Sequence, residues 1–212
     1  MANQNSGGFR LWGTMSGGQG ASPAAFVSEL ANNYGTAINK GDPIIPVSDG
    51  TVAIAAVNST NLLGVVTGCN YVINGKPTPS DFVPASTTFS PTTVGSPNAS
   101  RVQWIPFTAD TIWEIDGATA AQTTLAANLG LIGNNAPFTF NSLTASTVLG
   151  VSVACLDLAS AVTTAQQFRI ISIPGYTLEG LQLVDQDFTS ARFRFLVVCN
   201  QGFLPSYTTT GI

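Results

Sequence analysis

Two pairs of acidic residues are the best candidates for chemistry in this sequence. Glu114 and Asp116 are two positions apart, and so are Asp185 and Asp187. On a β-strand this spacing puts both members on one face, which is how a carboxylate dyad of the protease or glycosidase type would be built. Glu114 and Asp116, however, come directly before Gly117 at the end of a predicted strand, where acidic residues commonly form turns. We therefore favour a structural role.

Other catalytic and metal-binding patterns are missing from the sequence. There is no histidine, which excludes a Ser-His-Asp triad, a Cys-His dyad and zinc bound through imidazole. The glycines at 17–20 lack the preceding strand and the Lys-Ser or Lys-Thr of a phosphate-binding loop. The cysteines, Cys69, Cys155 and Cys199, lie in separate apolar runs, and we interpret them as buried thiols of a reducing compartment rather than a disulfide framework. We expect no enzyme, no cofactor and no metal site.

Two tryptophans leave one alternative function open. Trp104 and Trp113 lie on neighbouring predicted strands, and exposed indole rings are suited to stacking against sugars. Such residues more often belong to an aromatic core. A carbohydrate-binding or adhesin-like β module therefore remains an alternative to a purely structural protein.

The composition of the chain is unusually neutral. Of 212 residues, 44% are hydrophobic and only 8% are charged, with 7 Lys and Arg against 11 Asp and Glu. So few basic residues argue against binding to nucleic acid or to an anionic membrane surface. Neutral polar residues take the place of ions, with 25 Thr, 18 Ser and 15 Asn. These groups are cheaper to bury than charges, which suits a subunit of a larger assembly. An ordinary secreted β protein shares this bias and is the alternative.

No targeting or membrane segment is expected. Residues 1–20 lack the apolar stretch of a secretory signal. The most apolar later segment, residues 145–162, is interrupted by Ser152, Asp157 and Ser160, so it does not have the pattern of a membrane span.

The first 21 residues predict a flexible arm, because they are rich in glycine and show no core periodicity. Within this arm Phe9, Arg10, Leu11 and Trp12 form a patch whose large apolar side chains have no local partners. The patch either docks on a neighbouring subunit, as an added strand, or folds back on its own domain.

The rest of the chain, residues 22–212, predicts one β-rich domain, with two sub-modules divided near residues 84–100 as an alternative. Short helices are predicted over 22–30 and 118–130, and the segment 77–98 is expected to be extended and poor in strands. Asp49-Gly50 and Asn74-Gly75 predict tight hairpins. Strands are predicted over 43–47, 52–56, 62–67, 69–73, 101–107, 111–116, 148–155, 168–173 and 192–199. The expected fold is mostly β, an antiparallel barrel or sandwich with one or two short helices.

The last predicted strand has the clearest alternation. Every second residue from Phe193 to Cys199 is apolar, which predicts one face in the core. Arg192 and Arg194 would project from the other face, toward acids of the preceding segment at Glu179, Asp185 or Asp187. They form either solvated ion contacts of small energy or an intersubunit clamp.

A series of motifs in the sequence carries a family resemblance. In order along the chain they are Lys40-Gly41-Asp42-Pro43-Ile44-Ile45-Pro46-Val47, Asp49-Gly50-Thr51-Val52, Leu62-Leu63-Gly64-Val65-Val66-Thr67-Gly68, Tyr71-Val72 and Gly75-Lys76-Pro77. With the segments 102–107, 127–129, 168–171 and 192–200, they resemble the head decoration, or cement, proteins of tailed bacteriophages. The likeness covers roughly residues 38–200, and its motifs are loose and based on glycine. The glycine-rich arm and the Ser/Thr-rich stretch at 84–100 depart from the family pattern.

The resemblance implies a non-enzymatic virion protein, made in the host cytoplasm and bound to the outside of the capsid. Proteins of this family are commonly trimeric, contact the major capsid protein where capsomers meet, and stabilise the expanded head. The family has no catalytic residues to transfer. The candidate contacts with the capsid or a sister subunit are Phe9, Arg10, Leu11, Trp12, Arg192 and Arg194.

Overall fold

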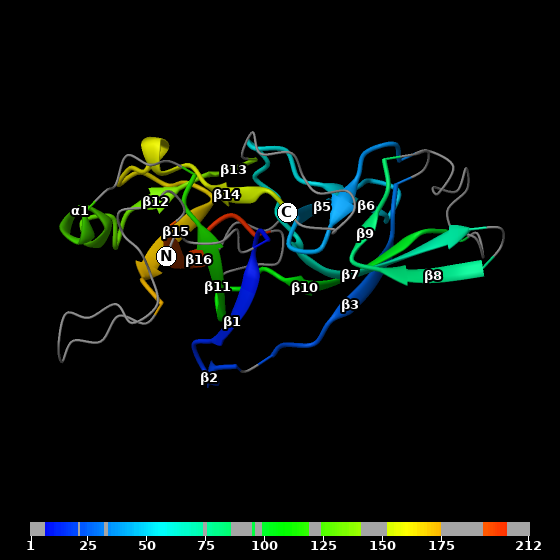
Figure 1. Cartoon of the computed structure of the whole chain (residues 1–212), viewed down its shortest axis with the longest axis horizontal. Helices are drawn as coiled ribbons and strands as arrows, with labels where there is room; N and C mark the ends of the chain where they lie inside the picture. The colour runs from blue at the N-terminus through cyan, green and yellow to red at the C-terminus, as the bar shows by residue number, and fades with distance from the viewer. Residues whose placement is uncertain are drawn as a thin grey trace.

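The computed structural model of the chain describes residues 7–20, 22–31, 34–73, 76–85, 95, 99–118, 124–140, 152–174 and 193–202. It is mostly β, with two antiparallel sheets side by side along the longest axis (Figure 1). This confirms the predicted fold class, and of the two expected architectures the described residues form the sandwich-like one and not a closed barrel.

Sheet A has six strands and contains the N-terminal part of the chain. In spatial order the strands are β12 (Asn135–Ala136), β15 (Phe168–Ser172), β16 (Arg194–Cys199), β11 (Thr111–Asp116), β1 (Arg10–Thr14) and β2 (Gly18–Gln19). The alternation predicted for the last strand is confirmed, because Phe193, Phe195, Val197 and Cys199 are all buried.

Sheet B is built around the long strand β7 (Gly64–Ile73). Strand β10 (Arg101–Pro106) pairs along one edge of β7, and β5 (Pro43–Pro46) and β8 (Lys76–Ser80) share the other. The outer strands are β3 (Phe26–Glu29) beside β10 and β6 (Val52–Ile54) beside β5. The predicted hairpin at Asp49-Gly50 joins β5 to β6, with Gly50 at a φ of 85°. Residues 74 and 75 of the second predicted hairpin lie outside the described part of the chain.

Two small ladders and two short helical segments complete the described fold. Strand β13 (Phe138–Phe140) pairs with β14 (Ala154–Leu156), and β4 (Ile38–Asn39) pairs with β9 (Phe82–Val83). Helix α1 (Leu125–Leu129) is capped by the Thr124 hydroxyl, which accepts from the amide of Ala127, and a 3₁₀ turn covers Leu158–Ser160. Helix α1 is shorter than the predicted helix over 118–130, of which residues 119–123 are not described.

The helix predicted over residues 22–30 is wrong. Its second half is strand β3, which pairs with β10 from Phe26 opposite Trp104 to Glu29 opposite Arg101. A helix of so few residues is unstable in isolation, so pairing with an available strand decides the conformation.

The strand-poor crossing predicted over residues 77–98 is also wrong in its described part. It contains β8 and β9, although Pro77 and Pro79 cannot donate hydrogen bonds to a neighbour. Strand β8 pairs with β7 alone among the described strands, and an edge position tolerates proline because one side of the strand needs no donors. The division predicted near 84–100 falls mostly on residues that are not described.

Two apolar clusters form the core. The larger one lies between sheet A and the β13–β14 ladder and also takes in Leu62, Val65 and Ile105 of the other half of the molecule. The smaller one lies under sheet B around Ile44, Val66 and Val102. The chain passes between the sheets directly, from β10 into β11, so residues of both halves share the larger core.

Candidate functional site

The predicted N-terminal patch folds back on its own domain. Phe9 is 3% exposed, and its ring lies 4.8 Å from the ring of Phe168 and 5.5 Å from that of Phe107. Strand β1 pairs with β11, and the pairing shifts by one residue between Leu11 and Gly13, so that Trp12 lies in a β-bulge and is half-buried. The prediction of a flexible arm is therefore wrong for residues 7–20, because a buried aromatic ring and a paired strand hold them. Phe9 is a core residue and not a surface contact.

The N-terminal segment meets the Lys40-Gly41-Asp42-Pro43 motif at a tight crossing of backbones. The Phe9 amide donates to the Gly41 carbonyl at 3.0 Å, and the Gly41 amide donates to the Val66 carbonyl at 2.8 Å. Gly41 has a φ of 91°, and a Cβ there would overlap the carbonyl oxygen of Gly7. Glycine is required at this position for both its backbone angle and its missing side chain. The crossing ties the first strand to sheet B.

Asp42 lies in the same crossing and is almost completely buried, with 1% of its surface exposed. Its carboxylate accepts hydrogen bonds from the Asn39 amide at 2.7 Å, from the Asn39 side chain at 3.3 Å and from Ser152. Burial raises the pKa of this carboxyl to about 6, although these hydrogen bonds work in the opposite direction. Tyr34 and Cys69 are close enough for the Asp42 charge to raise their pKa values further, in addition to the effect of burial.

The burial of Asp42 predicts that the protein gains stability as the pH falls from 7 toward 4. The native carboxyl takes up its proton near pH 6, and the unfolded one near its ordinary pKa of 3.8, so the native state binds more protons between these values. Asp42→Asn removes this linkage. The free energy of unfolding of the variant minus that of the wild type should therefore rise between pH 4 and pH 7. The expected rise is up to about 3 kcal/mol. Urea unfolding at both pH values measures the difference.

Asp49→Asn is the matched control for this experiment. Hydrogen bonds from Thr51 lower the pKa of the Asp49 carboxyl, so its proton uptake occurs below pH 4 in both states. The stability difference between Asp49→Asn and the wild type should therefore stay constant from pH 4.5 to 7. If the difference in unfolding free energy between Asp42→Asn and the wild type were also constant over this interval, the Asp42 carboxyl would not have the raised pKa that its burial predicts.

Arg194 contacts an acid other than the ones predicted for it. Glu114 on β11 accepts from Arg194 at 3.2 Å and from Arg10 on β1, and the Glu114 side chain is 9% exposed. Three adjacent strands thus contribute one acid and two guanidinium groups to the same face of sheet A. Arg192, Glu179, Asp185 and Asp187 lie outside the described residues. Through Glu114 the cluster links β1 and β16 to β11.

The two tryptophans are core residues. Trp113 is fully buried, and Trp104 is 7% exposed beneath the ring of Phe26, with a centroid separation of 5.1 Å. Their indole nitrogens donate to Thr111 and Ser28. Neither indole ring is exposed enough to stack against a sugar. The two tryptophans therefore give no support to the carbohydrate-binding alternative.

The three cysteines are free and buried, as predicted. Burial raises the pKa values of Cys69 and Cys199 to about 12, so both are protonated and unreactive at neutral pH.

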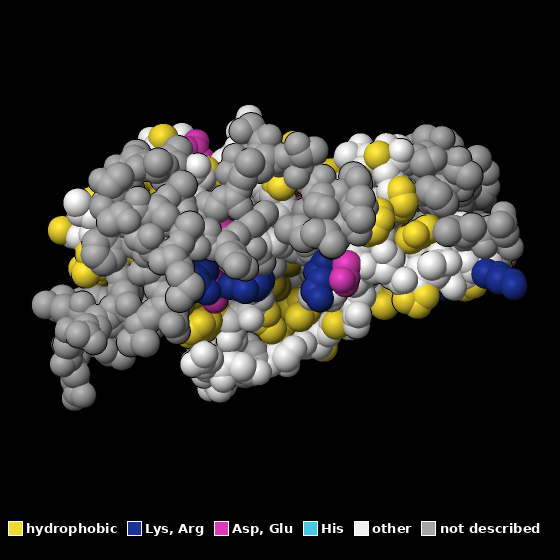
Figure 2. Space-filling view, in the orientation of Figure 1, with side chains coloured by type: hydrophobic (Ala, Val, Ile, Leu, Met, Phe, Trp, Pro, Cys, Tyr) yellow, Lys and Arg dark blue, Asp and Glu magenta, His cyan; other side chains and the backbone are white. Residues whose placement is uncertain are grey.

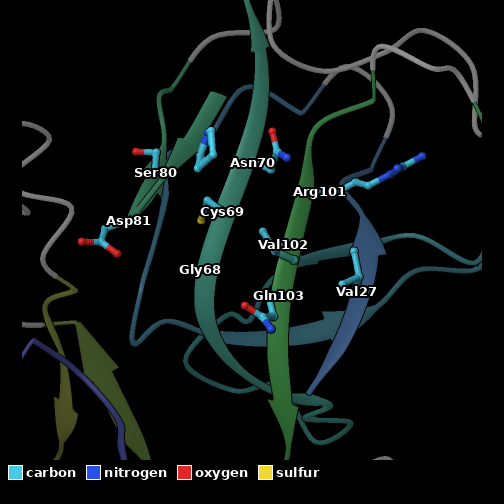
Figure 3. A pocket seen from close by; sticks show the side chains of 10 residues that line it. Val27, Gly68, Cys69, Asn70, Ser80, Asp81, Arg101, Val102 and Gln103 are labelled. Carbon is cyan, nitrogen blue, oxygen red and sulfur yellow. The ribbon is translucent and has the colours of Figure 1, made fainter. Parts of the chain in front are cut away.

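The sequence did not predict a groove that lies on sheet B. It has a volume of about 690 Å³ and crosses β3, β10, β7 and β8. Figure 3 shows Ser80 and Asp81 on one side of β7, and Arg101 and Val27 on the other. The residues that line it are Val27, Gly68, Cys69, Asn70, Pro79, Ser80, Asp81, Arg101, Val102 and Gln103. Uncharged residues, both apolar and polar, outnumber charged ones in this set. No periodicity marks the groove, because its residues come from four strands that only the tertiary pairing brings together.

The charged groups on the described surface are few and isolated. In Figure 2, dark blue and magenta side chains form small groups separated by neutral surface. Arg101 in the groove is already paired with Glu29 at 3.2 Å, and Lys40 is 3.7 Å from Asp81. Because these charges are paired, the groove offers a partner mainly uncharged surface, part apolar and part amide and hydroxyl.

No group of three or more acidic or cysteine side chains that could hold a metal ion occurs among the described residues. In the same part of the chain, no helix has the length and apolar character needed to cross a bilayer. No protein-family model, curated protein or solved structure matches the chain.

Proposed function

We propose that this chain is a structural virion protein that binds the outer surface of a phage capsid and stabilises contacts between capsomers. In this proposal its partner is the major capsid protein, it assembles as a homo-oligomer such as a trimer, and it has no catalytic role. The observation that carries the proposal is the open groove on sheet B, whose lining consists mostly of neutral side chains.

The chemistry of the groove suits contact with a protein lattice. Gln103, Asn70 and Ser80 present amide and hydroxyl groups that can pair with backbone or side chains of a partner at a lower desolvation cost than ions. Individual contacts of this kind are weak. On a symmetric shell, an oligomeric protein makes many of them at once, so their combined strength is high.

The sequence motifs that resemble decoration proteins support the same proposal from another direction. Gly41 and Asp42 of the first motif lie at the crossing of the N-terminal segment and sheet B. In the Leu-Gly-Val-Val motif, Gly64 allows the Ile105 backbone to approach, because a Cβ at Gly64 would overlap the Ile105 carbonyl oxygen. These motif residues therefore meet backbone constraints of this fold.

The location of the protein tests the proposed function. Particles purified from cells that express the gene should contain the chain by mass spectrometry, and the purified protein should co-sediment with expanded heads that lack it. Purified particles that contain no copies of the chain would contradict the proposal.

A charge placed in the groove tests whether this face makes the contact. Gln103→Glu preserves the size of an exposed side chain and adds a carboxylate at the predicted interface. Binding to heads should weaken by about tenfold or more, the effect of about 1.4 kcal/mol for an unpaired charge in an interface. Gln166→Glu, the same change on a half-buried side chain before β15, should bind like the wild type. Equal binding by both variants would exclude the groove as the contact.

A further inference from the structure

The floor of the groove on sheet B is formed by the neighbouring strands β7 and β10. On β7, Gly68 and Asn70 are two residues apart and therefore share one face, and Gln103 and Arg101 lie directly opposite them on β10. Figure 3 shows these four residues on the two strands. At Asn70, β7 has β10 on one side and β8 on the other, so its main-chain groups face other strands of the sheet. A partner in the groove must therefore bond to side chains of the floor.

The side-chain amide of Asn70 lacks one hydrogen bond. Its Oδ1 atom is buried, and no donor among the described residues lies within hydrogen-bond distance of it. A buried oxygen without a donor lowers stability, so such atoms are rare in native proteins and call for an explanation. The residue as a whole is half-buried and lines the groove. A turn about its χ angles would therefore present Oδ1 to an N–H group that enters the groove.

Gly68 is a glycine that the fold itself does not require. Its φ lies outside the left-handed region, and a Cβ at this position would meet only Gln103, at ordinary contact distances of 3.5 and 4.0 Å. The pairing of β7 with β10 shifts register beside it, but such a bulge does not need glycine when φ lies outside that region. Glycine inside a strand often marks a place where another backbone comes close. The missing side chain leaves a hollow in the floor beside Asn70.

The dimensions and chemistry of the groove suit an extended main chain. Neighbouring strands are about 4.8 Å apart, so the path from β3 across β10 and β7 to β8 measures about 14 Å, the length of about four extended residues. Main-chain N–H and C=O groups match the side-chain amides of Asn70 and Gln103, which both donate and accept. None of the described residues that line the groove is aromatic, so it lacks a ring that would stack against a sugar.

We propose that the groove binds an extended main-chain segment of the major capsid protein, which lies against Gly68 and donates an N–H group to Asn70 Oδ1. This inference rests on the proposed function and adds the chemistry of the partner at the contact. The free protein keeps an acceptor without a donor and a strand weakened by glycine. Binding supplies the donor and fills the hollow, so both residues serve recognition and not the stability of the fold.

Two variants test the proposal, because each should weaken binding without destabilising the free protein. Gly68→Ala adds a Cβ for which the free protein has room, and Asn70→Leu replaces the acceptor with an apolar group of similar size. The urea midpoint of each free variant should equal or exceed that of the wild type. The dissociation constant for expanded heads that lack the chain should rise by about tenfold, measured by co-sedimentation.

Matched changes outside the groove provide the controls. Gly130→Ala adds a Cβ that also fits, with its nearest atoms at 3.4 and 3.5 Å, and Thr78→Val removes a hydroxyl from β8 at a position that does not line the groove. Both control variants should bind heads like the wild type.

Four results would contradict the proposal. A lower urea midpoint for Gly68→Ala and Asn70→Leu would show that these residues serve the fold. Normal head binding by both variants would show that no main chain lies against them, even if Gln103→Glu weakens binding and the proposed function stands. A changed molecular mass of Gly68→Ala by light scattering, with head binding unchanged, would place a second copy of the chain in the groove. Wild-type protein that does not bind heads would contradict the proposed function, and this inference with it.

Discussion

Replacing Phe9 with alanine is expected to lower the free energy of unfolding by about 3–5 kcal/mol, the usual cost of removing a buried aromatic ring. The ring is 3% exposed and packs against Phe107, Phe138 and Phe168, so its loss opens a cavity in the larger core. Because β1 follows Phe9 directly, the same change should also loosen the pairing of β1 with β11. Denaturant unfolding followed by tryptophan fluorescence measures the effect.

Phe26→Ala is the matched control, because it removes the same side chain from an exposed position. Phe26 is 48% exposed and contacts Trp104 on one face, so we expect a loss of about 1 kcal/mol, the scale of a single aromatic pair. A similar small loss for Phe9→Ala would show that the N-terminal segment is not part of the core in solution, and that it belongs to an arm as the glycine content suggested.

Gly41→Ala should destabilise the protein about as much as the loss of the Phe9 ring does. The residue has a φ of 91°, which costs an L-amino acid about 1–2 kcal/mol, and its new Cβ would overlap the carbonyl oxygen of Gly7. The backbone crossing would have to open, with loss of the Phe9–Gly41 hydrogen bond and displacement of the N-terminal segment. We expect a total loss of about 3 kcal/mol or more, measured as a fall in the unfolding midpoint or as failure to accumulate in soluble form.

Gly50→Ala is the control that separates the cost of the positive φ from the cost of the Cβ overlap at Gly41. Gly50 has a φ of 85°, close to that of Gly41, but no atom lies within 4 Å of the position its Cβ would take. The free energy of unfolding of this variant should fall by only about 1–2 kcal/mol, the cost of placing a non-glycine residue at a positive φ. Equal losses for the two variants would mean that the crossing of Gly7 and Gly41 is not a close approach in solution.

Local signals in the sequence were sufficient for β5, β6, β7 and β10 of sheet B and for β11, β15 and β16 of sheet A. Asp49-Gly50 predicted a hairpin that forms, because its conformational requirement is met by two adjacent residues. The alternation from Phe193 to Cys199 predicted which face is buried, because a strand with one buried face must repeat every two residues.

The errors fall where a distant strand decides the conformation of a weak local pattern. Residues 26–29 have a short helix signal, but β10 provides hydrogen bonds to an extended chain, so β3 forms instead. The N-terminal glycines suggested flexibility, yet Phe9 finds a place between aromatic residues from positions 107 to 168. Nothing in the sequence indicated that Glu114 of β11 would lie beside Arg194, because only the sheet order brings these residues together.

The sequence by itself determined that this is a mostly β protein with few charged residues and without histidine chemistry, since composition and two-residue periodicity depend on no long-range information. Only the tertiary structure decided where the N-terminal segment lies, that Asp42 is a buried carboxyl, and that four strands form a groove on sheet B. The physical reason is common to all three. Burial, pKa values and grooves are properties of residues brought together from distant parts of the chain, and a linear pattern does not record which strands become neighbours.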